Sequence, residues 1–130
     1  MTEINLKEIA EKLDTAWKKT FNQVSPQTEV NEDEICFGNY ALVHKDIEVT
    51  KVSILGEKTK TVKGLELVIF VERYTPSEPI DVDEVPLSEH EREDDAIIAL
   101  IEHEAHRRAS AILTNIEFEE MAKEHNEKHL

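Results

Sequence analysis

The sequence predicts an α+β fold: an N-terminal amphipathic helix, an antiparallel meander sheet of about three or four strands, and a long C-terminal helix. Apolar residues recur at helical spacing near both ends, and the middle is rich in β-branched and aromatic residues punctuated by glycines. We expect one domain over residues 1–130, divided into a helix at 1–24, a sheet at 35–75, an acidic proline-containing linker at 76–87 and a long helix at 88–128.

The first helix is indicated by apolar side chains three and four residues apart, among them Leu6, Ile9 and Leu13. Asn5 precedes this stripe and stands three residues before Glu8, which is the spacing of a capping box. Pro26 ends the helical pattern, because proline disfavours helix in the residue before it. We therefore expect a helix that buries one side against the sheet.

The middle of the chain predicts strands joined by short connections, which favours antiparallel pairing. In the run at 62–74, apolar residues occur at both odd and even positions and so point to both faces of a strand. We therefore expect a central strand with both faces at least partly covered. A hairpin arm with lysines near its tip spans residues 55–64. We interpret these lysines as a guard against unwanted edge pairing, with a contact site for an acidic partner as the alternative. The expected strands lie at 35–37, 40–44, 47–55 and 62–74.

The long helix is predicted to begin at Ser88, because Ser88 and Glu91 have capping-box spacing and Pro86 lies just upstream. A kink or break is expected near Thr114-Asn115, where the main apolar stripe loses phase. A second apolar set lies on a different sector of the helix, which predicts contact with a second copy. These dimer-helix candidates are Ile97, Leu100, Ala111 and Phe118.

The composition is strongly acidic, with 29 Asp and Glu against 15 Lys and Arg and a net charge of −14. This charge excludes direct nucleic-acid binding as a leading function, since that function needs a basic face. No apolar run is long enough to cross a bilayer, so no membrane partner is expected. The single cysteine, Cys36, fits a reducing compartment and reads as a small buried hydrophobe. We expect a soluble, cytoplasmic protein.

Nine acidic residues lie between positions 78 and 95, where Arg92 is the only Lys or Arg. This segment therefore carries a net charge of −8. Such a segment is suited to a basic surface on another protein, with association that weakens as salt rises. The partner-binding patch is predicted to comprise Glu78, Asp81, Asp83, Glu84, Glu89, Glu91, Glu93, Asp94 and Asp95.

One cluster on the long helix has metal-ligand chemistry. Glu102, His103 and His106 share part of the helix surface, but the two histidines are three residues apart, whereas a zinc-protease helix needs four. An exposed Glu-His pair is the simpler interpretation, and a metal site is the alternative. We expect no catalytic residues and no cofactor.

These patterns favour a non-catalytic acidic interaction protein, dimeric through the long helix, that engages a basic protein surface. An inhibitor that imitates nucleic acid, as some phage proteins do, has the same charge profile. One alternative is a chaperone-like or assembly subunit that binds a peptide at a sheet edge, with Ile35 to Val43 as the contact. The other is a metal-dependent enzyme that uses the cluster at Glu102.

Overall fold

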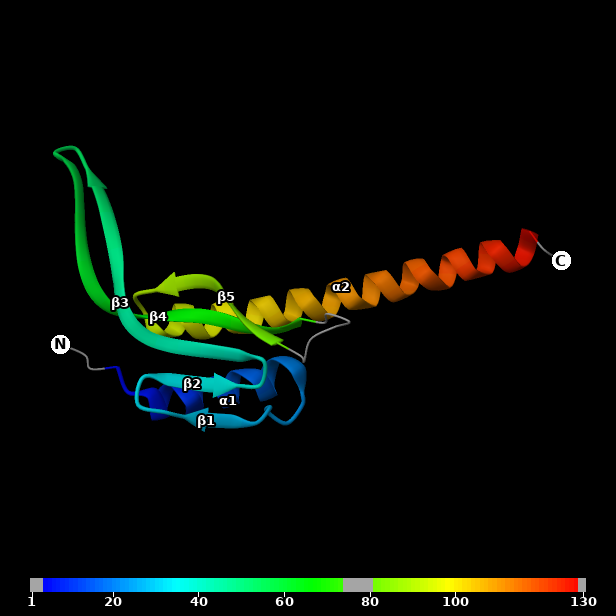
Figure 1. Ribbon diagram of the computed structural model, residues 1–130, viewed down its shortest axis with the longest axis horizontal. Helices are drawn as coiled ribbons and strands as arrows, with labels where there is room; N and C mark the ends of the chain where they lie inside the picture. Colours follow the sequence, from blue (N-terminus) through cyan, green and yellow to red (C-terminus); the bar gives the residue numbers. More distant parts are fainter. Residues whose placement is uncertain (1–3, 74–80, 129–130) are drawn as a thin grey trace. The chain divides into compact units, whose positions relative to one another are not determined.

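The computed structural model describes residues 4–73 and 81–128 and confirms the α+β class: an N-terminal helix, an antiparallel sheet and a long C-terminal helix (Figure 1). The sheet has five strands, more than the three or four expected. In chain order the elements are α1 (Leu6–Phe21), β1 (Thr28–Val30), β2 (Glu34–Phe37), β3 (Tyr40–Ser53), β4 (Gly56–Arg73), β5 (Asp81–His90) and α2 (Glu93–Lys128).

The chain divides into two compact units, Met1–Leu100 and Ile101–Leu130. The first unit contains α1, the sheet and the beginning of α2. The second consists of the remainder of α2. A single domain over residues 1–130 stays a prediction.

Helix α1 forms for the reasons that its sequence indicates. The Asn5 side-chain oxygen accepts hydrogen bonds from the backbone N–H of Lys7 at 3.1 Å and of Glu8 at 3.4 Å, which satisfies two donors that a helix leaves free. The helix ends at Asn22, which adopts the left-handed conformation with φ of 52°. Its bounds therefore lie within the predicted range 1–24.

The sheet is a meander in which every strand pairs antiparallel with its neighbour, in the order β1-β2-β3-β4-β5. Short connections produce this arrangement, because antiparallel neighbours need only a turn between them. β3 and β4 form the longest ladder, which runs from Tyr40 opposite Ile69 to Ser53 opposite Gly56. β1 and β5 are the edge strands.

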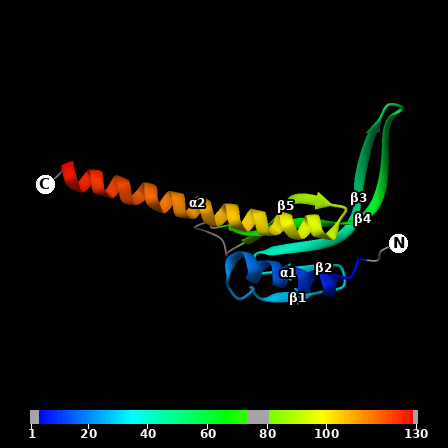
Figure 2. The same ribbon diagram turned by 180° about the vertical axis from the view of Figure 1, so that it is seen from behind.

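The core lies between one face of this sheet and the helices of the first unit. Figure 2 looks onto this side, with α1 and the beginning of α2 in front of the strands. The Trp17 ring lies 5.4 Å from the Phe37 ring in an edge-to-face arrangement. Side chains of both layers are almost fully buried; they include Ile9, Leu13, Ile35, Phe37, Tyr40, Leu42, Leu65, Leu67, Ala96 and Leu100.

The linker predicted at 76–87 and the helix start predicted at Ser88 are corrected by the structure. Residues 81–90 form strand β5, α2 begins at Glu93, and residues 76–80 lie outside the described residues. Pro86 is accommodated because β5 is an edge strand, where a missing N–H costs no ladder bond on the open side. The Ser88 hydroxyl contacts the His90 Nε2 atom at 2.6 Å, and Ser88 itself lies within the strand.

The break predicted near Thr114-Asn115 is also absent from the described helix, since α2 continues from Glu93 to Lys128. The Thr114 hydroxyl donates to the Ser110 carbonyl oxygen at 2.9 Å. A threonine that bonds back four residues in this way is accommodated inside a helix, so it does not cap a new one.

Gly64 marks the point where β4 leaves the five-stranded sheet. A Cβ atom at this position would lie 2.5 Å from Ile47 Cδ1 and 2.6 Å from the His90 carbonyl oxygen. The Ile47 side chain, which is 4% exposed, therefore occupies the space that any larger residue would need. Only glycine allows the β5 backbone and Ile47 to approach β4 so closely here.

Substituting Gly64→Ala is expected to lower the free energy of unfolding by about 1–3 kcal/mol, because either Ile47 or the β5 backbone must move. Chemical denaturation monitored by circular dichroism measures the change. Thr61→Val, an exposed and nearly isosteric change on the same strand, is the control and is expected to stay within about 0.5 kcal/mol. Equal stabilities for the two variants would contradict the close packing at Gly64.

Candidate functional site on the acidic sheet face

The sheet has a second face, opposite the one that packs on α1. Side chains alternate along each strand, so the neighbours of the buried leucines on β4 point to this other side. Figure 1 looks onto it, and α1 and the beginning of α2, both in the first unit, lie behind the strands in that view. Besides Glu72 near the end of β4, strand register brings five glutamates from four strands to this face, which we call the acidic face: Glu29, Glu34, Glu66, Glu84 and Glu89.

The centre of the acidic face is apolar. One row across the sheet aligns Cys36, Ala41, Val68 and Pro86, of which Ala41 and Val68 are buried and Pro86 is exposed. Cys36 is half-buried. Two further half-buried apolar residues, Val43 and Phe70, lie in the adjacent rows on the same face. The acidic face is therefore an apolar strip with carboxylates around it.

Lys45 is the cation on this face that the structure places within reach of the glutamates. Its ammonium group donates to Glu66 at 3.1 Å, in a part-buried ion pair. The hydrogen bond that Lys45 donates to Glu66 and the charge of Glu66 raise the pKa of Lys45, and the charge of Glu89 adds to the effect. The lysine therefore stays protonated and offsets part of the negative charge at one end of the face.

The Cys36 thiol lies among these carboxylates and responds to them. Burial raises the pKa of Cys36, and the negative charge of Glu34, its hydrogen bond with the thiol, and the charges of Glu29 and Glu84 raise it further. The thiol donates to Glu34 at 3.7 Å. Three carboxylates from three strands therefore act on one point near the apolar centre.

The predicted acidic patch is divided by the structure among several surfaces. Glu84 and Glu89 lie on the acidic face, whereas Asp81 and Asp83 alternate onto the opposite side of β5. Glu91 precedes α2, and Glu78 lies outside the described residues. The remaining three, Glu93, Asp94 and Asp95, form the first turn of α2, where Glu93 pairs with Lys12 of α1.

Sequence reasoning missed Glu29, Glu34 and Glu66 as members of one site. They lie in three different strands, and only the pairing register brings them together. One signal was present in the sequence: Glu66 alternates with Val68 and Phe70 on the side of β4 that does not carry the leucines.

The predicted metal cluster has few features of a site. Glu102 and His106 are exposed and His103 is half-buried. Among residues 4–73 and 81–128, no group of three potential ligands is positioned to hold a metal ion. Within this part of α2 the buried carboxylate is Glu104, which accepts hydrogen bonds from Arg107 and Arg108 at 3.1–3.2 Å. The adjacent charges therefore form a local ion-pair cluster.

The four dimer-helix candidates do not share one environment. Ile97 and Leu100 are buried, with 7% and 0% exposure, and so belong to the core of the first unit. Ala111 and Phe118 are exposed, Phe118 by 67%. Other large apolar side chains of the second unit are exposed as well, namely Ile112, Leu113, Ile116 and Met121.

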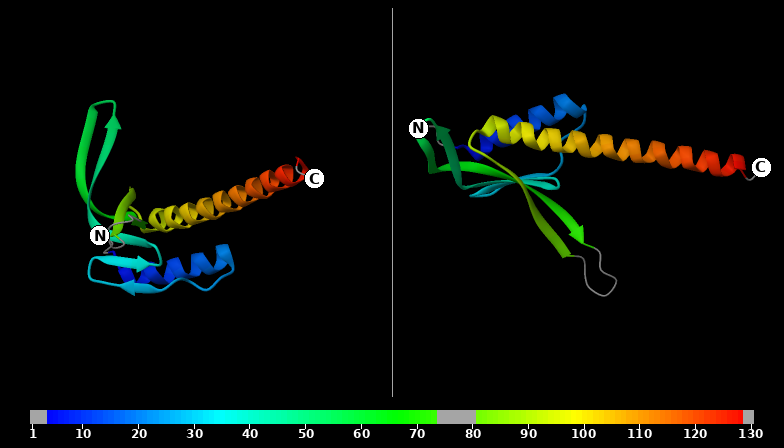
Figure 3. Two further views of the ribbon diagram at one scale, coloured as in Figure 1. Left: turned by 45° about the vertical axis from the view of Figure 1, so that its right-hand side comes forward. Right: turned by 90° about the horizontal axis from the view of Figure 1, so that it is seen from above.

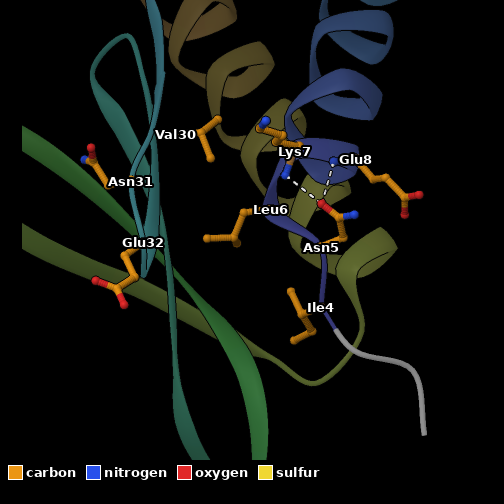
Figure 4. A pocket seen from close by; sticks show the side chains of 8 residues that line it. All are labelled: Ile4, Asn5, Leu6, Lys7, Glu8, Val30, Asn31 and Glu32. Atoms are coloured by element: carbon orange, nitrogen blue, oxygen red, sulfur yellow. Dashed lines mark hydrogen bonds between the residues drawn. The ribbon is translucent and has the colours of Figure 1, made fainter.

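A hollow lies between the start of α1 and the turn from β1 to β2 (Figure 4). The backbone N–H groups that would attract an anion there, those of Lys7 and Glu8, already bond to the Asn5 side chain. Two carboxylates, Glu8 and Glu32, also line the hollow. Its chemistry therefore disfavours an anionic ligand.

The peptide-binding alternative placed its contact at Ile35 to Val43, and the structure corrects the premise that this segment is a sheet edge. β2 lies between β1 and β3, so its backbone groups are paired on both sides. Ile35, Phe37 and Leu42 are fully buried. An added strand would have to pair with β1, with β5, or with the distal parts of β3 and β4, which have one neighbouring strand each.

Neither described helix combines the length and the apolar character that crossing a membrane requires. Comparison with known protein families, with curated protein sequences and with solved structures found no match to this chain. The residues of the acidic face are therefore the basis for proposing a function.

Replacing Glu34→Gln is expected to lower the pKa of Cys36, because a nearby negative charge that disfavours the thiolate is removed. At a pH below this pKa, the rate of Cys36 alkylation should rise by about twofold, since the thiolate is the reactive form. Alkylation followed by mass spectrometry across a pH series measures the effect. Glu32→Gln, an exposed change off the acidic face, should leave the rate unchanged. Equal rates for both variants would contradict the effect of the Glu34 charge on the Cys36 thiol.

Proposed function

We propose that this protein is a non-catalytic interaction protein whose acidic face binds a basic, partly apolar surface of another protein. The observation that carries the proposal is the convergence of five glutamates around an apolar strip on the sheet face opposite α1. Carboxylates at the rim steer and orient a cationic partner, while the apolar centre supplies contact area that water would otherwise cover.

The layout of charge supports a protein partner with mixed chemistry. Lys45 offsets only part of the negative charge, and the pKa of Cys36 is raised first by burial and then by the negative charges of Glu34, Glu29 and Glu84. A partner with lysines or arginines beside apolar residues satisfies both parts. The nucleic-acid-mimicking inhibitor is a narrower form of this proposal and stays a prediction, as does cytoplasmic location.

Self-association through the second unit is the other part of the proposal. Ile112 and Ile116 are 60% and 45% exposed and lie one turn apart on the same side of α2. Ala105 and Ala109 continue this side of the helix and are also exposed. An exposed apolar stripe of this kind favours pairing with the same stripe of a second copy.

Removing charge from the acidic face is expected to weaken binding of a synthetic peptide that alternates lysine with valine. The variant changes Glu29, Glu34, Glu84 and Glu89 to glutamine and should lose about 10- to 100-fold in affinity, at roughly 0.2–1 kcal/mol per exposed pair. Titration calorimetry at several salt concentrations measures it. Binding to the unchanged protein should weaken as salt rises.

A matched control removes four charges elsewhere, by changing the exposed residues Glu11, Glu32, Glu91 and Glu119 to glutamine. This variant has the same net charge as the face variant and is expected to bind the peptide nearly as well as the unchanged protein. Equal losses in the two variants would show that overall charge, not the acidic face, attracts the peptide.

The double substitution Ile112→Asp and Ile116→Asp is expected to reduce the mass of the particle at a given concentration, because it places charge in the helix stripe. Analytical ultracentrifugation over a dilution series measures the change. Ser110→Asp, an exposed change on another side of the same helix, is the control. An unchanged mass for the double variant would exclude pairing through this stripe.

A further inference from the structure

The distal parts of β3 and β4 form a two-stranded arm with no further strand beside it among the described residues. Pairing of β3 with β2 stops at Val43, and pairing of β4 with β5 begins at Leu65. Beyond these residues, 45–53 pairs with 56–64 alone (Figure 3). A two-stranded hairpin is at best marginally stable in water, so an arm of this length favours a partner that covers it.

The two sides of the arm differ in how their polar groups are matched. On one side, Asp46 and Lys63 form an ion pair at 2.7 Å, and the hydroxyls of Thr50 and Thr59 contact each other at 3.0 Å. On the other side Lys51 lies directly opposite Lys58. Two like charges in this position repel each other and weaken the hairpin.

This second side, which we call the lysine side, consists of Lys51, Lys58 and Lys60 together with Val49 and Val62. Val49 is directly opposite Lys60, so apolar and cationic groups alternate along the arm. No ion pair joins the three lysines to another of the residues that the structure describes. An acidic partner would remove the repulsion between them.

The tip of the arm is apolar and fully accessible. Ile54 and Leu55 form the turn, and their exposures are 105% and 95%. Isolated apolar side chains are common on protein surfaces, but two adjacent ones at the end of a lysine-bearing ribbon form a contact surface. The arm therefore presents cationic and apolar side chains, which complement the carboxylates and the apolar strip of the acidic face.

We propose that the arm of one copy of this protein docks with its lysine side on the acidic face of a second copy, and that Ile54 and Leu55 cover the apolar strip. This inference rests on the proposed function, because it takes the acidic face as the receptor and names its partner. The three lysines of the arm lie against a face with five glutamates, so the two surfaces have opposite charge. The acidic face keeps a net negative charge in this contact.

The geometry of this contact is head to tail. The arm and the acidic face are different surfaces, so each copy offers one arm and receives another. Contacts of this type build closed rings or open chains, whereas pairing of identical helix stripes stops at two copies. The arm contact therefore closes as a pair when two copies exchange arms, and otherwise continues to a larger ring or chain.

Mixing two variants that are defective on opposite surfaces tests the proposal. The arm variant changes Lys51, Lys58 and Lys60 to glutamate, which retains a like-charged pair across the arm and so leaves the repulsion within the hairpin comparable. The face variant changes Glu29, Glu34, Glu84 and Glu89 to glutamine. All full-length chains in this experiment also carry Ile112→Asp and Ile116→Asp, so that pairing through α2 does not contribute.

With intact arm and face, the particle mass is expected to rise with concentration above that of one chain and to fall as salt is added. Each defective variant alone should sediment as one chain. The equimolar mixture should form a complex of one arm variant and one face variant, because one intact arm and one intact face remain. Circular dichroism establishes that each variant is folded.

A control that changes Lys7, Lys19 and Lys123 to glutamate reverses the same number of charges away from the arm and should associate like the parent. Association of the arm variant alone to the same mass as the parent would overturn the inference, as would a mixture that shows no complex or a parent chain that stays single at every concentration.

Failure of this inference is distinguishable from failure of the proposed function. If the acidic face binds the lysine-valine peptide but the mixture of variants forms no complex, the receptor is retained and the second copy is excluded as its partner. If the peptide binds the face variant and the parent equally, the acidic face itself is excluded.

Discussion

The alternation of side chains along β4 is the constraint on which the rest of the structure depends. Leu65, Leu67 and Ile69 are buried on the core side of the sheet, and this requirement sends Glu66 and Phe70 to the other side. A slip of one residue in the pairing would bury carboxylates and expose leucines. The same register that makes the core therefore also assembles the acidic face.

The sequence predicted those parts of the fold that depend on interactions between residues close together in the chain. Helix α1 was predicted closely, because its apolar stripe and its Asn5 cap are local signals. β5 was assigned to a linker and to the start of α2, since Ser88 and Glu91 resemble a helix cap at short range. Pairing with β4, in which Ser88 lies opposite Leu67, overrides that local preference.

The acidic face could be predicted only in part, for the same reason. The high acidity between residues 78 and 95 was evident, but a count along the chain does not distinguish the two sides of β5. Register sends Glu84 and Glu89 to one side and Asp83 to the other, and it adds Glu34 from β2 and Glu66 from β4. Local density of charge and shared orientation of charge are separate properties.

Gly64 connects the packed sheet to the arm, and its position has a consequence for assembly. The direction in which a ribbon leaves a sheet is set where the pairing changes from five strands to two, and here that point is a residue without a side chain. In a head-to-tail series, the angle between successive units determines whether the series closes and after how many members. The architecture of such an assembly would then depend on the backbone at this one position, which lies opposite Lys45 at the border between the acidic face and the arm.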